Sequence, residues 1–167
     1  MAVGEFSTMA FLPARARAGA KKGYAEGRRS ELAAWLSALS LAGLGRPVGG
    51  RADWEREATS VARSWLRLVD DGRHPASWSA AAPLLREEVG PQDWAAALRA
   101  ARAPLGRCWW RKLRSRAVVE GPAGDLRGPY VVIRFESVFE RQTRAAETVT
   151  PALGPDGSWR VAAYFIS

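Results

Sequence analysis

The sequence predicts an α+β domain in which three helices pack on a four-stranded, curved antiparallel sheet. Between Asp53 and Pro104, apolar residues recur every three or four positions, the period of helices with one buried face. From Cys108 to Ile166, apolar and polar residues alternate instead, as in strands that bury one face. With 47% apolar residues and eight tryptophans, a chain of this length can form a core of its own.

Start and stop signals delimit the three helices. We assign Asp53 as the N-cap of the first helix and Gly72 as the residue that ends it. A second, shorter helix is expected to start near Pro75, and a third at Pro91. The apolar faces of these helices carry Trp54, Trp65 and Leu68, then Trp78 and Leu85, then Trp94 and Leu98.

Four strands are expected to follow. The first, Cys108–Val119, reads as a long, basic edge strand, and the second is Tyr130–Phe139. The last two, Glu147–Leu153 and Trp159–Ile166, form a hairpin with Asp156-Gly157 at its turn. The second strand should turn Val131, Ile133, Phe135 and Phe139 towards the core and Arg134, Glu136 and Glu140 away from it.

The predicted domain spans residues 53–167, and residues 1–52 form a basic leader. The leader has eight basic and three acidic residues, a net charge of +5, against +3 for the domain with seventeen and fourteen. Because most of the excess charge lies outside the predicted fold, the sequence disfavours nucleic acid as a partner. We expect the leader to pack little against the domain.

An apolar run in the leader, Leu32–Leu44, follows Arg28-Arg29. Its thirteen residues are too few to span a hydrocarbon core of about 30 Å, so no transmembrane helix is expected. Basic residues before a short apolar run are typical of an export signal. The leader is therefore an export signal or a disordered extension. The protein is periplasmic or secreted in the first case and cytoplasmic in the second.

Cys108 and His74 are the only cysteine and histidine. With one of each, the chain cannot form an intramolecular disulfide or a metal site built from several thiolates or imidazoles, and we expect neither metal nor cofactor.

Glu147 is the candidate for chemistry, because sharing a face with Val149 would aim its carboxylate into the concavity between sheet and helices. Arg102 is its natural partner. The pair is then either a structural ion pair or part of an acid/base site.

Several strings in the chain resemble the bacterial domain-of-unknown-function-4019 family, over roughly residues 57–167. They are Trp65–Gly72, Ser77-Trp78, Trp94, Arg102–Gly106, Ser115-Arg116, Gly128–Phe135, Glu147–Val149, Asp156–Val161 and Tyr164–Ile166. The order of helices and strands resembles the cone-shaped, cystatin-like folds of the nuclear-transport-factor-2-like superfamily. The resemblance implies a small domain, often with an export signal, and it supplies no catalytic residues.

Two classes of function stay open. The first is a non-catalytic binding module for a small apolar ligand or a protein partner, monomeric or dimerising through the sheet. Its candidate pocket residues are Trp65, Trp78, Trp94, Phe135 and Trp159. The alternative is an enzyme that uses Glu147 as acid or base, with Arg102 or Tyr164 orienting the substrate. Trp109 and Trp110 stand among cations on the edge strand, where we favour protection against aggregation over nucleic-acid binding.

Overall fold

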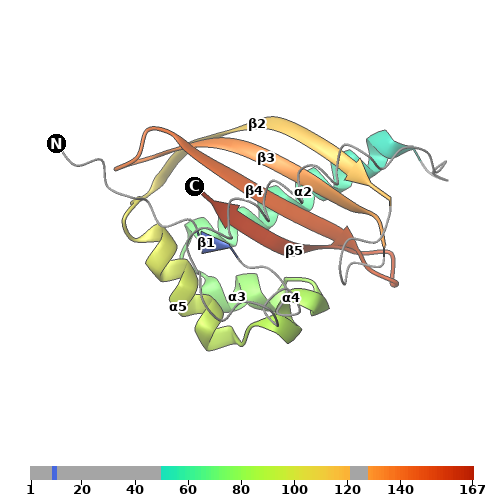
Figure 1. Ribbon diagram of the computed structural model, residues 1–167, viewed down its shortest axis with the longest axis horizontal. Coiled ribbons are helices and arrows are strands. Elements are labelled where there is room, and N and C mark those ends of the chain that lie inside the picture. Colours follow the sequence, from blue (N-terminus) through green and yellow to red (C-terminus); the bar gives the residue numbers. More distant parts are fainter. Residues whose placement is uncertain (1–8, 11–49, 121–127) are drawn as a thin grey trace, which may run out of the picture.

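The computed structural model describes residues 9–10, 50–120 and 128–167, which form four helices and one antiparallel sheet (Figure 1). The strands lie in the order β1-β5-β4-β3-β2. The helices are α2 (Arg51–Asp70), α3 (His74–Ser79), α4 (Pro83–Glu88) and α5 (Pro91–Arg102); the strands are β1 (Met9–Ala10), β2 (Cys108–Val119), β3 (Tyr130–Phe139), β4 (Ala145–Leu153) and β5 (Trp159–Ile166). The predicted α+β class, with four long antiparallel strands, is confirmed.

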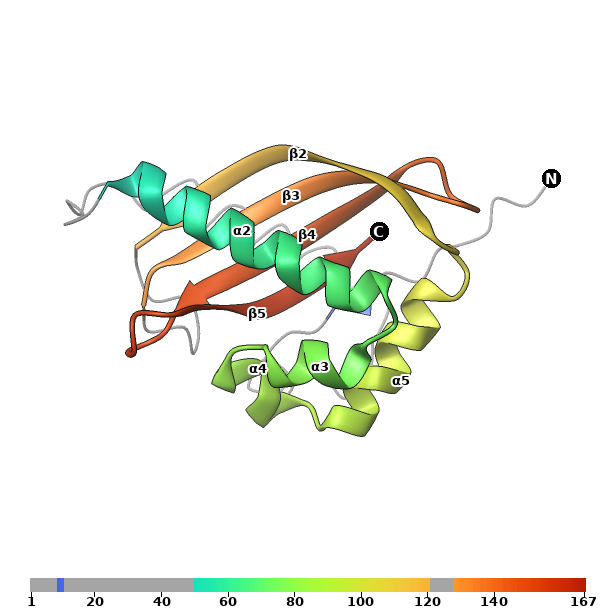
Figure 2. The same ribbon diagram turned by 180° about the vertical axis from the view of Figure 1, so that it is seen from behind.

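Helix α2 lies along one face of the sheet and contacts the four long strands, while α3, α4 and α5 gather beyond β5 (Figures 1 and 2). The core fills the space between α2 and the sheet, where Trp65, Leu66, Ile133, Phe135 and Val149 are buried. Trp65 is only 3% exposed, which confirms its predicted place in the core.

The predicted start of α2 is wrong, whereas its predicted end at Gly72 is confirmed. The helix begins at Arg51, and its N-cap is Gly50, whose carbonyl accepts a hydrogen bond from the backbone N–H of Asp53 at 2.6 Å. Assigning Asp53 as the N-cap was therefore wrong, because this residue already lies in the first turn. At the other end Gly72 adopts a φ of +69°, the left-handed conformation expected of a residue that ends a helix.

The second predicted helix is two helices, so the prediction of three is wrong. Residue Ala82 between α3 and α4 is extended, with φ −60° and ψ 150°, and its N–H donates to the Val161 carbonyl of β5 at 2.8 Å. Pro83 follows as the first residue of α4 and has no N–H to donate to the preceding turn. This contact with the sheet replaces the helical hydrogen bonds that the apolar pattern suggested.

Strands β2, β3 and β5 have the predicted bounds, and β4 begins two residues before Glu147, at Ala145. Strand β1 was not predicted: Met9 and Ala10 pair with Ile166 and Phe165 of β5. The expectation that the leader packs little against the domain is thus corrected at these two residues. The apolar run Leu32–Leu44 lies outside the described residues. Among the helices described here, none is long and apolar enough to cross a membrane.

Candidate functional site

The register of the sheet places Glu147 beneath the helices. On β4 it pairs with Phe135 of β3, and its side chain is fully buried between the sheet and the helix layer. A carboxylate removed from water is costly unless charged and hydrogen-bonding partners replace the lost hydration. The surroundings of Glu147 therefore decide what this residue does.

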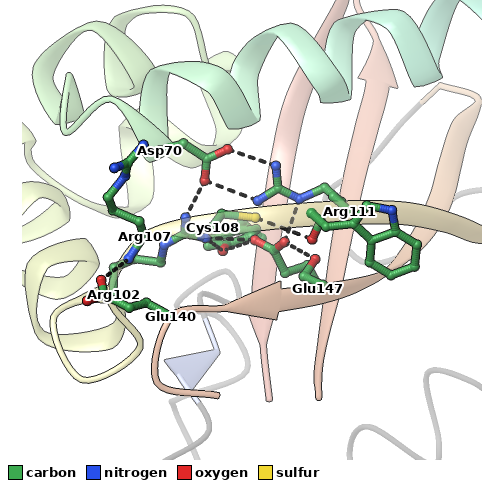
Figure 3. Close-up of polar contacts among 10 residues, drawn as sticks. Asp70, Arg102, Arg107, Cys108, Arg111, Glu140 and Glu147 are labelled. Atoms are coloured by element: carbon green, nitrogen blue, oxygen red, sulfur yellow. Dashed lines mark hydrogen bonds and ion pairs between the residues drawn. The ribbon is translucent and has the colours of Figure 1, made fainter. Parts of the chain in front are cut away.

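Four donors bind the Glu147 carboxylate, two on each oxygen. Arg102 Nη1 and the Tyr164 hydroxyl donate to Oε1 at 2.8 and 2.6 Å. Arg111 Nε donates to Oε2 at 2.6 Å, and the Ser137 hydroxyl donates to the same oxygen. Figure 3 shows Arg102 and Arg111 approaching Glu147 from different elements, α5 and β2. The carboxylate is thus saturated by groups of the protein.

Asp70, the last residue of α2, joins the two arginines from the other side. Arg111 donates from Nη1 and Nη2 to the Asp70 carboxylate at 2.8 and 3.1 Å, and Arg102 Nη2 donates to it as well (Figure 3). Asp70, Arg102, Glu147 and Arg111 therefore form a closed circuit of ion pairs, which we call the ionic ring. Two carboxylates balance two guanidiniums, so the ring has no net charge.

The two arginines of the ring and the neighbouring Tyr164 hold their protons firmly. Burial lowers the pKa of Arg102, but Tyr164, Glu147 and Asp70 more than offset this and raise it above its ordinary value. Arg111 follows the same pattern with Asp70 and Glu147. Burial, followed by the charge of Glu147, raises the pKa of Tyr164 well above 10, so this phenol remains a donor at neutral pH.

The sequence predicted the pairing of Glu147 with Arg102 and named Tyr164 beside them, and the structure brings all three together. It did not predict Arg111, Ser137 or Asp70 as members of this group. One signal for Ser137 was available: it is a small polar residue between Phe135 and Phe139 on the buried face of β3. Such a break in an apolar face often marks a buried polar contact.

The five candidate pocket residues belong to the core. Trp65, Trp94, Phe135 and Trp159 are buried, and Trp78 packs against the same cluster. Each indole N–H has an acceptor within the domain: Ser77 O for Trp65, Ser77 Oγ for Trp94, Val89 O for Trp78 and Glu57 Oε2 for Trp159. These side chains support the fold and offer little surface to a ligand.

Two other tryptophans, consecutive in the sequence, are exposed on the edge strand β2. Trp109 is 65% exposed and Trp110 is 47% exposed. In the described part of the chain, these are the large apolar residues that are exposed to solvent. The pairing with β3 shifts register between Cys108 and Trp110, so Trp109 is an extra residue in a β-bulge. A bulge re-aims side chains, and here it accompanies two adjacent indoles at the surface.

Cys108 and His74 contribute no metal site. Within residues 9–10, 50–120 and 128–167, no cluster of three histidine, cysteine or acidic side chains could hold a metal ion. Burial raises the pKa of the Cys108 thiol, which keeps it protonated and weakly nucleophilic. Burial also lowers the pKa of His74, as do the charges of Arg99 and Arg102, so this imidazole is neutral at pH 7.

Fold and site together define a small α+β domain whose sheet is tied to two of its helices by a partly buried ionic ring. The chain belongs to the family described as "Protein of unknown function (DUF4019)", whose model matches residues 61–164. All four residues of the ionic ring lie within the matched range. A search of the curated proteins and a search of the solved structures each found no match.

Proposed function

We propose that this chain is a non-catalytic binding module whose partner is another protein. The observation that carries the proposal is the exposure of the adjacent Trp109 and Trp110 on an edge strand. Tryptophan is enriched in the parts of protein interfaces that contribute most to affinity. Two neighbouring indoles in solvent are costly for a monomer, and a partner that covers them recovers the free energy of burying them.

The interior of the domain supports binding at the surface over binding in the concavity. Small apolar ligands need open apolar surface, whereas Trp65, Trp94 and Phe135 are packed against one another in the core. Glu147 likewise has four donors on its two oxygens, which leaves no free lone pair aimed at a substrate. We therefore assign a structural role to Glu147, with Arg102 and Tyr164 as its supports.

We further propose that the fold is the cone of the nuclear-transport-factor-2-like superfamily. We also propose that the protein is bacterial and that its leader directs it to the periplasm or the exterior. The long helix α2 lying along a curved sheet supports the first part (Figure 2). The apolar run Leu32–Leu44 after Arg28-Arg29 supports the second. Mass spectrometry of the mature N-terminus from the native host tests export: a start beyond residue 44 supports it, and an intact leader contradicts it.

The binding function is tested by comparing partner capture with and without the exposed indoles. The full-length chain and its W109A/W110A variant are immobilised and exposed to an extract of the native host, and bound proteins are quantified by mass spectrometry. We expect at least one protein to be retained by the parent and depleted about tenfold with the variant. Equal capture of every protein by both would contradict the proposal.

A further inference from the structure

The outer edge of β2 is open to a partner. In the described part of the chain, β2 has a strand neighbour on one side only, β3. An edge strand presents backbone N–H and C=O groups that another extended segment can pair with. Trp109 and Trp110 lie on this edge strand, so apolar anchors and unpaired backbone occur together.

The charges along β2 are unevenly balanced. The strand has four cations and no acidic residue, and Arg107 precedes it. Arg111 belongs to the ionic ring, while Arg114 pairs with Glu136 and Arg116 with Glu55. Among the described residues, the side chains of Arg107 and Lys112 have no ion-pair partner, and both are exposed. These two cations flank the tryptophan pair on either side, so the edge is complementary to an anionic segment.

The same charges disfavour two occupants that the chain itself could supply. A second copy pairing through β2 would bring two strands of like charge together, which is destabilising. The leader carries a net charge of +5 and would meet the same repulsion. Charge complementarity therefore points to another molecule.

The edge is also held in a fixed shape. Register shifts occur at Cys108/Trp110 and at Leu113/Ser115, and residues Trp110–Leu113 between them pair regularly with β3. Arg111, in the middle of this segment, is fixed by the ionic ring to Asp70 and Glu147. A preorganised edge loses little conformational entropy on binding.

We propose that an acidic, extended segment of a partner protein adds as a strand to the free edge of β2 along Trp109–Leu113. Its apolar side chains cover Trp109 and Trp110, and its carboxylates pair with Arg107 and Lys112. This inference rests on the proposed function and names the chemistry of the partner. Nucleic acids and lipids fit less well, because they have no peptide backbone to pair with the edge, and the remaining cations of β2 already have partners.

The probe is a fluorescein-labelled peptide of alternating glutamate and valine, about ten residues long, titrated with the full-length protein and followed by fluorescence anisotropy. We expect W109A/W110A to weaken binding about tenfold or more and K112E to weaken it several-fold. R73E makes the same charge change at an exposed residue before α3 and is expected to leave binding within about twofold. The same peptide with alternate backbone amides methylated should lose most of its affinity, because it cannot pair with the edge.

Each alternative gives a distinct result. Equal binding of the methylated peptide, or no binding of the parent peptide up to about 1 mM, overturns strand addition. Tighter, tryptophan-dependent binding of a single-stranded oligothymidylate, or of phosphatidylglycerol vesicles, would assign the surface to nucleic acid or membrane and also overturns it. If a host protein is captured through the tryptophans but the acidic peptide does not compete, this inference fails while the proposed function stands.

Discussion

Arg111 on the edge strand β2 donates its Nε–H to Glu147 on β4 at 2.6 Å, across the intervening strand β3. The residue of β3 that pairs with Arg111 is Ser137, which is fully buried and whose hydroxyl also donates to Glu147. A short side chain at this position leaves room for the guanidinium to cross. The edge strand is thereby fixed to the centre of the sheet by charge as well as by its ladder with β3.

The Ser137 hydroxyl is expected to contribute measurably to stability. Ser137→Ala keeps the size of the side chain but removes one donor to a buried carboxylate, and we expect a loss of about 1.5–3 kcal/mol in urea denaturation. Ser79→Ala is the matched control, because its hydroxyl bonds a backbone carbonyl at an exposed helix end. It should change stability by less than about 0.5 kcal/mol. Equal losses in the two variants would show that the Ser137 bond to Glu147 adds nothing.

Trp65 joins the helix layer to the sheet. Its ring centroid lies 5.8 Å from that of Trp94 and 5.4 Å from that of Tyr164. Trp65→Ala should reduce the free energy of unfolding by about 3–5 kcal/mol, because the cavity cannot collapse fully. Trp110→Ala, on the surface, is the control and should cost little. A loss below about 1 kcal/mol for Trp65→Ala would mean that its apolar stripe is misassigned.

Two glycines with similar backbone conformations allow the cost of backbone strain to be measured separately from the cost of steric overlap. Gly106, just before β2, has φ +75°, and Gly72 has φ +69°. A Cβ at Gly106 would lie 2.7 Å from Oε2 and 2.9 Å from Cβ of Glu140, whereas one at Gly72 meets nothing within 4 Å. Gly72→Ala should cost about 1–2 kcal/mol from backbone strain, and Gly106→Ala about 1–3 kcal/mol more. Equal costs in chemical denaturation would show that Glu140 moves aside freely.

His74 should make stability depend on pH. Because burial and then the charges of Arg99 and Arg102 lower its pKa below 6.5 in the folded state, the unfolded chain binds the proton more tightly. The contribution is fully present above the unfolded pKa of 6.5 and is lost as the pH falls towards the folded pKa. Urea midpoints at about pH 7.5 and 5.5 should therefore fall more for the parent than for His74→Gln. Parallel decreases would contradict a lowered pKa.

Much of the fold could be predicted from local pattern. The bounds of β2, β3 and β5 and the burial of Trp65 follow from alternation and helical spacing, which depend on near neighbours in the chain. The break between α3 and α4 and the strand β1 could not be predicted in this way. Both depend on contacts with β5, which lies far away in the sequence.

The candidate site, like the fold, could be predicted from the sequence only in part. Glu147 and Arg102 could be paired from sequence, because a buried carboxylate on β4 needs a cation and α5 supplies one. Arg111 could not be singled out, since it is one of four cations on β2, and two bulges in that strand disturb the alternation that would reveal its face. Only the register shows that it reaches Glu147.

The central claim is that Glu147 is a structural residue of a binding module, and the stability of Glu147→Gln tests it most directly. The change leaves the buried Arg102 and the partly buried Arg111 with one carboxylate between them, so urea denaturation at neutral pH should show a loss of about 3–5 kcal/mol with an unchanged m-value. Glu87→Gln, exposed on α4, makes the same substitution outside the ring and should be nearly neutral. If Glu147→Gln instead lost less than about 1 kcal/mol, the carboxylate would not be needed for the fold, and its structural assignment would be contradicted.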